Sequence, residues 1–198
     1  FASVQPRYNL LFRQPERELF PLCEEEGLGV LTYNLLAGGM LTGKHSRDLP
    51  PDSASRFAST GAADLYRERY WHDASFTAVE RLAALAADLG LALPTLAAAW
   101  VLSRPAVTSV VLGATRAEQL DLPLAALAIE LRKHVVVKRV QADRLVRGQR
   151  PGGRGPDHDR RAGDLFAGQA EAPRGVVRIH HVEADVHGRR GAILVLDL

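Results

Sequence analysis

The sequence of 198 residues contains a single cysteine and no long apolar run. One cysteine cannot form an internal disulfide, which excludes the class of small secreted domains that disulfides stabilise. No apolar stretch approaches the roughly 20 residues of a membrane-spanning helix, and the opening residues, FASVQPRYNL, lack the charged and apolar regions of a secretory signal. We therefore expect a cytoplasmic protein that has no membrane partner.

Charge of one sign and aromatic side chains are also scarce. The formal net charge is +2 and aromatic residues make up 6% of the chain, so we expect no nucleic-acid partner. Hydrophobic residues make up 46%, which is enough for one sizeable core or two small ones. Cys23 lies among the apolar positions of an expected helix, and we interpret it as a buried thiol and not as a nucleophile.

Segments typical of strands alternate with segments typical of helices along the first 131 residues. The expected elements are, in order, a strand at residues 4–11, a helix at 16–27, a strand at 29–33, helices at 73–90 and 94–103, a strand at 107–113, and a helix opened by a capping box of Thr115 and Glu118. The helix at 73–90 is amphipathic, with the expected core-facing residues Phe76, Val79, Leu82, Ala83, Ala86 and Leu89. This order of elements indicates an α/β fold with a parallel sheet.

Two glycine-containing loops follow expected strands, and ligands of parallel sheets bind at the carboxyl ends of the strands. In the first loop, YNLLAGGMLTGKH, the glycine pair lets the backbone approach a bound group and Lys44 supplies a positive charge, although such pairs also occur in flexible connections. In the second, Gly113, Thr115 and Arg116 precede a helix, whose N-terminus favours an anion by roughly 0.3–1 kcal/mol. Two anion sites at one edge of a sheet suggest a dinucleotide.

These segments together resemble the C-terminal half of an aldo-keto reductase. The matching stretches are VQPRYNLL, GVLTYNLLAGGMLTGKH, RF, LYRERYW and LPTLAAAWVLSRPAVTSVVLGATRAEQL. The resemblance is to the branch that includes bacterial general reductases, aflatoxin-aldehyde reductases and potassium-channel β subunits. It implies that residues 1–131 are the last three strand-helix units of a (β/α)8 TIM barrel, that an N-terminal part is missing, and that the activity is NADPH-dependent reduction of aldehydes or ketones.

The same resemblance implies cofactor contacts in the first half of this segment. Gln5 would bond to the nicotinamide carboxamide, and Tyr33 would stack on the nicotinamide ring. The pyrophosphate would be held by the backbone of loop residues and by two basic side chains: Asn34, Leu35, Leu36, Ala37, Gly38, Lys44 and Arg56. Two alternatives stay open, because Tyr33 could be an ordinary aromatic at a strand end and Arg56 a solvated loop charge.

The adenosine end of the cofactor would lie on the second loop. The resemblance implies that Gly113, Thr115 and Arg116 take the 2′-phosphate that distinguishes NADPH from NADH, and that Gln119 approaches the adenine. Pro123 stands where the family pattern has an adenine-binding asparagine. A proline inside a helix costs about 3 kcal/mol or more, so we expect a kink in this last helix. Leu35 likewise replaces a proline that the family usually has.

No catalytic residue can be assigned. The family's tetrad of aspartate, tyrosine, lysine and histidine comes from the first half of the barrel, which no segment here matches. The chain is therefore interpreted as the cofactor-binding half of an oxidoreductase that acts on a small-molecule carbonyl substrate, with a separate N-terminal half as an expected partner. The alternatives are a non-catalytic nucleotide-sensing module and a truncated or frame-shifted gene product. Alone, three strands would leave open sheet edges and a marginally stable fragment.

Residues 132–198 form a tail that is unrelated to this family pattern and is expected to be disordered or poorly folded. Arginine, glycine and proline dominate residues 144–168, as in a linker or in a shifted reading of a GC-rich gene, and short strands are expected at 176–179 and 192–196. A metal site is disfavoured because alternating positions of a strand point to opposite faces. The candidate ligands for it would be His180, His181, Glu183, Asp185 and His187.

Overall fold

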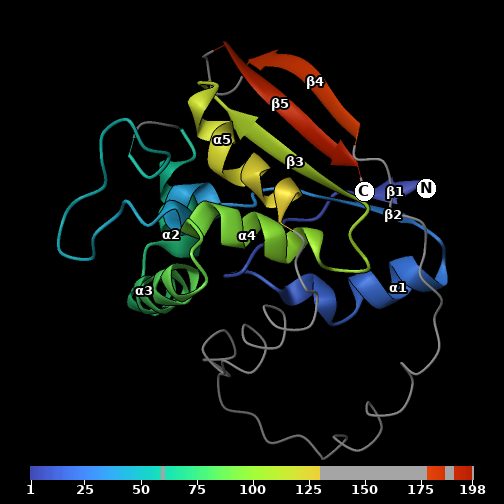
Figure 1. The fold of residues 1–198 in the computed structure, drawn as a ribbon, viewed down its shortest axis with the longest axis horizontal. Helices are drawn as coiled ribbons and strands as arrows, with labels where there is room; N and C mark the ends of the chain where they lie inside the picture. Colours follow the sequence, from blue (N-terminus) through green and yellow to red (C-terminus); the bar gives the residue numbers. More distant parts are fainter. Residues whose placement is uncertain (59–60, 130–177, 186–189, 198) are drawn as a thin grey trace, which may run out of the picture.

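A computed structural model of the protein describes residues 1–58, 61–129, 178–185 and 190–197. Its strands are β1 (Ser3–Val4), β2 (Gly29–Thr32), β3 (Ser109–Ala114), β4 (Arg178–Asp185) and β5 (Arg190–Asp197). They form one sheet in the order β1-β2-β3-β5-β4 (Figure 1). β1 pairs in parallel with β2, and β2 in parallel with β3, which confirms the prediction of three adjacent parallel strands.

Helical segments cover this sheet and its loops. They are the 3-10 helices η1 (Gln14–Glu16), η2 (Ala37–Thr42) and η3 (Ala125–Ala128) and the α-helices α1 (Leu19–Glu25), α2 (Ala63–Tyr70), α3 (Asp73–Asp88), α4 (Leu93–Leu102) and α5 (Glu118–Leu124). α4 is buried at every residue from Leu93 to Val101 and contacts α3, α5 and β3. α4 is therefore the central helix of the core.

Aromatic side chains connect α4 to the segment after β1. The fully buried ring of Trp100 stacks on Tyr8, with centroids 5.2 Å apart, and Phe20 of α1 contacts Tyr8 edge-on, with centroids 4.8 Å apart. Such pairs add about 0.5–1.5 kcal/mol each beyond their burial. They fix α1 and α4 on the same part of the sheet. Cys23, on α1, is buried as expected.

The amphipathic pattern of residues 73–90 correctly predicted α3 and its buried face. Phe76, Val79, Leu82 and Ala86 are buried, and Ala83 and Leu89 are half-buried against the core. A histidine caps this helix, because the ring of His72 accepts a hydrogen bond from the N–H of Ser75.

The strand predicted at residues 4–11 is wrong beyond Val4. Pro6 has no N–H to donate to a neighbouring strand, and the side chain of Asn9 turns the chain by accepting a hydrogen bond from the N–H of Leu11 at 2.9 Å. The residues between Pro6 and Asn9 keep only an isolated parallel bridge, which pairs Arg7 with Tyr33.

Helix α2 was not predicted from the sequence. Its eight residues, ADLYRERY, carry alternating charges and only a narrow apolar stripe. The stripe consists of Ala63, Tyr66 and Tyr70, which are buried. Because this pattern is short and mostly polar, it gives a weak helical signal on its own.

The end of the chain covers an edge of β3 that was expected to stay open. β5 pairs antiparallel with β3 along Ser109 to Ala114, and β4 pairs antiparallel with β5. Both strands are longer than the short strands predicted at 176–179 and 192–196, and they place residues 178–185 and 190–197 in the sheet. The linker at 144–168 and the candidate ligand His187 lie outside the described residues. Among those that the structure does describe, no cluster of three or more metal ligands occurs.

No single helix of the described part of the chain is long and apolar enough to cross a membrane. In that part, only α3 and α4 together would be long and apolar enough, and they are bent by 90° relative to each other. α4 is also a buried core helix.

Candidate functional site

Two connecting segments lie at the carboxyl ends of β2 and β3: loop 1 (residues 33–44) and loop 2 (residues 113–119, which include the end of β3 and the start of α5). Since the two strands are parallel neighbours, both loops leave the same edge of the sheet. Arg56 lies between them. Its Nη1 donates to the hydroxyl of Tyr66 at 3.1 Å, and its Nη2 is 3.8 Å from the place that a Cβ on Gly113 would occupy. Because the Tyr66 ring also packs against Gly38 of loop 1, Arg56 is close to both loops.

Loop 1 folds back on itself through left-handed backbone conformations. Asn34 and Ala37 have φ values of 62° and 52°, and Gly38 and Gly39 have φ values of 70° and 106°. The Asn34 side-chain oxygen accepts a hydrogen bond from the N–H of Gly38 at 2.7 Å, and the Asn34 carbonyl accepts one from the N–H of Ala37 at 2.9 Å. These two N–H groups therefore donate within the loop itself.

The side chains of loop 1 divide into a buried and an exposed set. Leu35 and Ala37 are 3% and 0% exposed and pack in the core. Leu36 is half-buried and Lys44 is exposed. Next to Lys44, burial and the ammonium charge of that lysine lower the pKa of His45 below its usual value.

The nicotinamide end of the predicted site is defined by two exposed residues. Gln5 directly follows β1 and is exposed. Tyr33 directly follows β2 and is 37% exposed, and its N–H donates to the carbonyl of Pro6 at 3.1 Å. Both residues lie at the carboxyl ends of adjacent parallel strands.

Loop 2 differs from the predicted capping box. The N–H and hydroxyl of Thr115 both lie against the side-chain oxygen of Gln119, at 2.9 and 3.3 Å, and Glu118 makes no such contact. α5 begins only at Glu118, with Ala117 as its uncapped N-cap residue. The helix starts later than Thr115 would require, and Gln119 is the first residue that can reach back. The capping-box prediction is wrong for that reason, and Gln119 is engaged within the protein.

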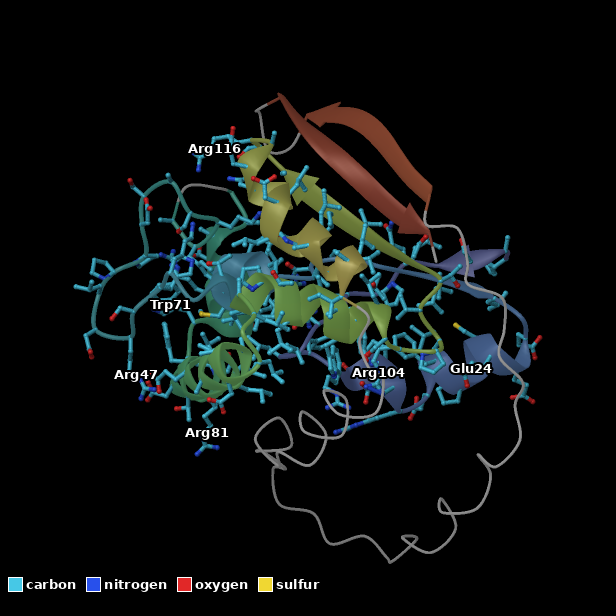
Figure 2. The ribbon with its side chains drawn as sticks, in the orientation of Figure 1. Glu24, Arg47, Trp71, Arg81, Arg104 and Arg116 are labelled. Carbon is cyan, nitrogen blue, oxygen red and sulfur yellow. The ribbon has the colours of Figure 1, made fainter. Side chains whose placement is uncertain are left out.

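Arg116 and Pro123 lie near the two ends of α5. Arg116 is exposed and extends from the chain just before α5 (Figure 2). Pro123 is buried inside α5, which ends one residue later and continues as the 3-10 helix η3. The α-helix therefore changes to a 3-10 helix directly after the proline.

The family follows from sequence comparison. The sequence pattern of the Aldo/keto reductase family matches residues 1–143. This chain belongs to the aldo/keto reductase family. The match extends past Leu131, the end of the segment in which we found the resemblance.

The relatives of this aldo/keto reductase family member have names that indicate different functions. It is 40% identical to a probable voltage-gated potassium channel subunit beta of Oryza sativa. The alignment of 141 residues covers 70% of this chain and 42% of that protein. It is 35% identical to the NADH-specific methylglyoxal reductase of Escherichia coli (65% of this chain, 37% of the other) and 35% identical to the human aflatoxin B1 aldehyde reductase member 2 (62% and 37%). The chain spans less than half the length of these relatives.

A solved structure shares the fold. The glycerol dehydrogenase of Gluconobacter oxydans superposes with a TM-score of 0.59 at 23% identity, over 78% of this chain and 46% of that protein. The parallel strands and helices of this aldo/keto reductase chain thus correspond to part of an aldo-keto reductase barrel.

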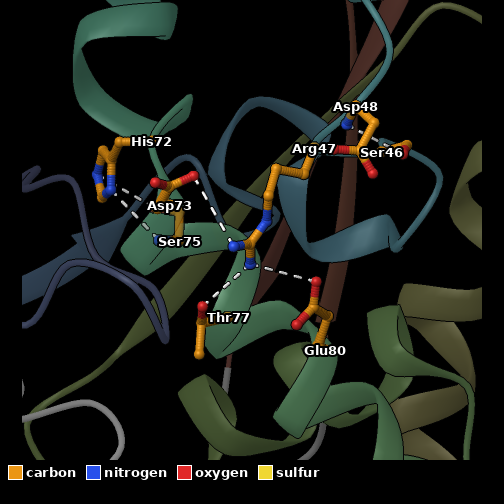
Figure 3. A network of polar contacts seen from close by, with 8 residues as sticks. All are labelled: Ser46, Arg47, Asp48, His72, Asp73, Ser75, Thr77 and Glu80. Atoms are coloured by element: carbon orange, nitrogen blue, oxygen red, sulfur yellow. Dashed lines mark hydrogen bonds and ion pairs between the residues drawn. The ribbon is translucent and has the colours of Figure 1, made fainter.

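Sequence reasoning missed a network that ties the segment after loop 1 to α3 (Figure 3). Nη2 of Arg47 donates to the Thr77 hydroxyl at 3.1 Å and lies 3.4 Å from a Glu80 carboxylate oxygen. Its Nη1 is 3.9 Å from a carboxylate oxygen of Asp73. Because these partners are about thirty residues away in the sequence, no local pattern could have indicated the contact.

Proposed function

We propose that this chain forms the cofactor-binding part of an NADPH-dependent oxidoreductase that reduces an aldehyde or ketone to an alcohol by hydride transfer. The observation that carries the proposal is the position of loop 1, loop 2 and Arg56 at one edge of a parallel sheet. Ligands of such sheets bind at this edge, and family membership supports a nicotinamide cofactor.

The residues at this edge suit a dinucleotide. Lys44, Arg56 and Arg116 supply three positive charges for phosphate groups. Gly113 leaves open the position beside Arg56 that a side chain would fill, since among the described residues only the Arg56 guanidinium lies within 4 Å of it. Tyr33 offers an exposed ring at the end of β2 for the nicotinamide, and Gln5 offers an amide at the end of β1.

Preference for NADPH over NADH rests on Arg116. A 2′-phosphate would gain a charge-assisted hydrogen bond worth about 1.5–3 kcal/mol, which NADH cannot make. The Thr115 hydroxyl could contribute after rotating away from Gln119. Glu118 and Asp121 in the first turn of α5 oppose an anion, so the net preference depends on the arginine. One relative is named as NADH-specific, which makes this preference a property to be measured.

Reduction of a carbonyl to an alcohol would require a proton donor as well as the hydride that a bound reduced nicotinamide supplies. The carbonyl oxygen becomes an alkoxide unless a positioned acid protonates it. No residue of this chain is assigned that role. We therefore propose that a separate N-terminal half provides the acid and the pocket for a small-molecule carbonyl substrate, and that this chain shows no turnover by itself.

A second candidate is a nucleotide-sensing module without turnover. It is favoured by the 40% and 37% identity to probable potassium channel β subunits of Oryza sativa and Arabidopsis thaliana. The two candidates share the binding site and differ only in catalysis.

Titration of the purified chain with NADPH and NADH tests the shared part. We expect saturable binding of NADPH, weaker binding of NADH, and no oxidation of NADPH when aldehydes are added. Addition of an N-terminal half from an active relative should restore turnover for the enzyme and leave it absent for the sensing module. A chain that binds neither nucleotide would contradict both.

A further inference from the structure

Asn34 has a backbone conformation that asparagine adopts less readily than glycine. Its φ of 62° lies in the left-handed region, and the residue directly follows the proposed nicotinamide-stacking Tyr33. Residues persist in such conformations only where surrounding contacts over-determine them, and these positions cluster at functional sites. The contacts that fix Asn34 therefore bear on how loop 1 is shaped.

Those contacts come from a buried tyrosine on α2 and a buried asparagine near β1. The Tyr70 hydroxyl accepts a hydrogen bond from Nδ2 of Asn34 at 3.0 Å and one from Nδ2 of Asn9 at 3.1 Å. Nδ2 of Asn9 also donates to the Asn34 carbonyl at 2.9 Å. Tyr70 and Asn9 are 1% and 0% exposed. Three segments that are distant in the sequence thus share one network.

The network sets the direction of the Asn34 amide. An amide group has a donor end and an acceptor end, and the Tyr70 hydroxyl takes the donor end. The acceptor end faces the N–H of Gly38, from which Oδ1 accepts at 2.7 Å. Without the hydroxyl, Nδ2 of Asn34 loses its acceptor, and the amide is held only by the hydrogen bond from Gly38.

We propose that Tyr70 is a positioning residue, which holds loop 1 in its nucleotide-binding conformation through Asn34 without touching the nucleotide. This inference rests on the proposed function, because it concerns the affinity of the same site. It assigns to α2 a role in shaping the part of loop 1 that would face the pyrophosphate. That group is common to NADPH and NADH, so the network serves both nucleotides equally.

The first measurement is independent of nucleotide binding. Tyr70→Phe in the full chain keeps the ring and removes the hydroxyl, so amide hydrogen exchange at Gly38 should accelerate relative to the wild type. Tyr8→Phe is the matched control: it removes the hydroxyl of another buried tyrosine, whose partner is Glu16, and should leave exchange at Gly38 unchanged. Unchanged exchange at Gly38 in Tyr70→Phe would overturn the proposal.

The second measurement is nucleotide affinity. Tyr70→Phe should weaken NADPH and NADH binding equally, by roughly three- to tenfold, which is the effect of losing one buried hydrogen bond. In an Asn34→Gly background the same substitution should have a much smaller effect, because glycine lacks the side-chain amide and keeps only the carbonyl that Asn9 contacts. An equal loss with and without Asn34, or a loss confined to one nucleotide, would overturn the positioning role.

Asn34→Gly also covers the case in which Tyr70→Phe does not fold. Glycine adopts a φ of 62° without strain, yet this variant should still show faster exchange at Gly38 and weaker binding of both nucleotides. Wild-type behaviour would overturn the proposal. If the wild-type chain binds neither nucleotide, the proposed function fails, while the exchange comparison still decides whether Tyr70 orders loop 1.

Discussion

The ring of Tyr66 lies directly against the backbone of Gly38. A Cβ added to this glycine would be 2.6 Å from Cδ1 and 2.9 Å from Cε1 of the tyrosine, closer than side-chain atoms pack. Because Tyr66 is buried on α2 and accepts a hydrogen bond from Arg56, its ring cannot withdraw freely. Loop 1 therefore packs against α2 at this contact.

The contact predicts that Gly38→Ala destabilises the protein. The new methyl group would clash with the ring, and a φ of 70° is unfavourable for alanine; together these should lower the free energy of unfolding by about 2–4 kcal/mol. Urea denaturation measures the change. Gly61→Ala is the control, since nothing lies within 4 Å of its added Cβ, and it should change stability by less than about 0.5 kcal/mol. Similar small effects for both variants would refute the close packing of Gly38 against Tyr66.

Arg116→Ala should separate the two nucleotides. Loss of the charge-assisted bond to the 2′-phosphate should weaken NADPH binding by about ten- to hundredfold and leave NADH binding nearly unchanged. Fluorescence titration with both nucleotides measures the two dissociation constants. Arg67→Ala removes an exposed arginine that pairs with Asp64 on α2 and should alter neither. Equal losses for NADPH and NADH would show that Arg116 does not read the 2′-phosphate.

Arg47→Ala should loosen the segment after loop 1 without unfolding the protein. Exposed ion pairs contribute about 0–1 kcal/mol each, so the free energy of unfolding should fall by less than about 1 kcal/mol. Limited proteolysis within residues 46–54 should become faster, because the side-chain contacts to α3 are lost. Arg81→Ala, at an exposed position of the same helix, should leave cleavage unchanged, and identical cleavage patterns for Arg47→Ala and wild type would contradict the role of Arg47.

His45 should make stability rise with pH in the range around its ordinary pKa of about 6.5. Burial, and then the charge of Lys44, lower its pKa in the folded state, so the unfolded chain binds this proton more readily. The contribution is complete above the unfolded pKa and is lost as pH falls below it. Urea denaturation of wild type and His45→Gln at pH 5.5 and pH 7.5 isolates the effect. The pH dependence should be smaller in the variant, and an equal dependence in both proteins would rule it out.

Local sequence patterns determined the helices and strands in which buried residues recur at regular spacing. Phe76, Val79, Leu82 and Ala86 recur at the spacing of a helix that rests on a core, and the helix formed there. The alternation of strands and helices gave the parallel order of β1, β2 and β3, because helical crossover connections join parallel strands. The glycine and basic residues of both loops were also recognisable, since their chemistry is visible without their neighbours.

Only the tertiary structure decided what those loops contact. The charged residues of α2 weakened its helical pattern, so the sequence did not indicate that Tyr70 contacts Asn34 or that Tyr66 contacts Gly38. The capping contact moved from Glu118 to Gln119 because α5 begins only at Glu118. β5 covered an edge of β3 that the local pattern left open. The contacts of α2 and of β5 depend on pairs of residues far apart in the chain, and their free energy of contact is absent from any local window of sequence.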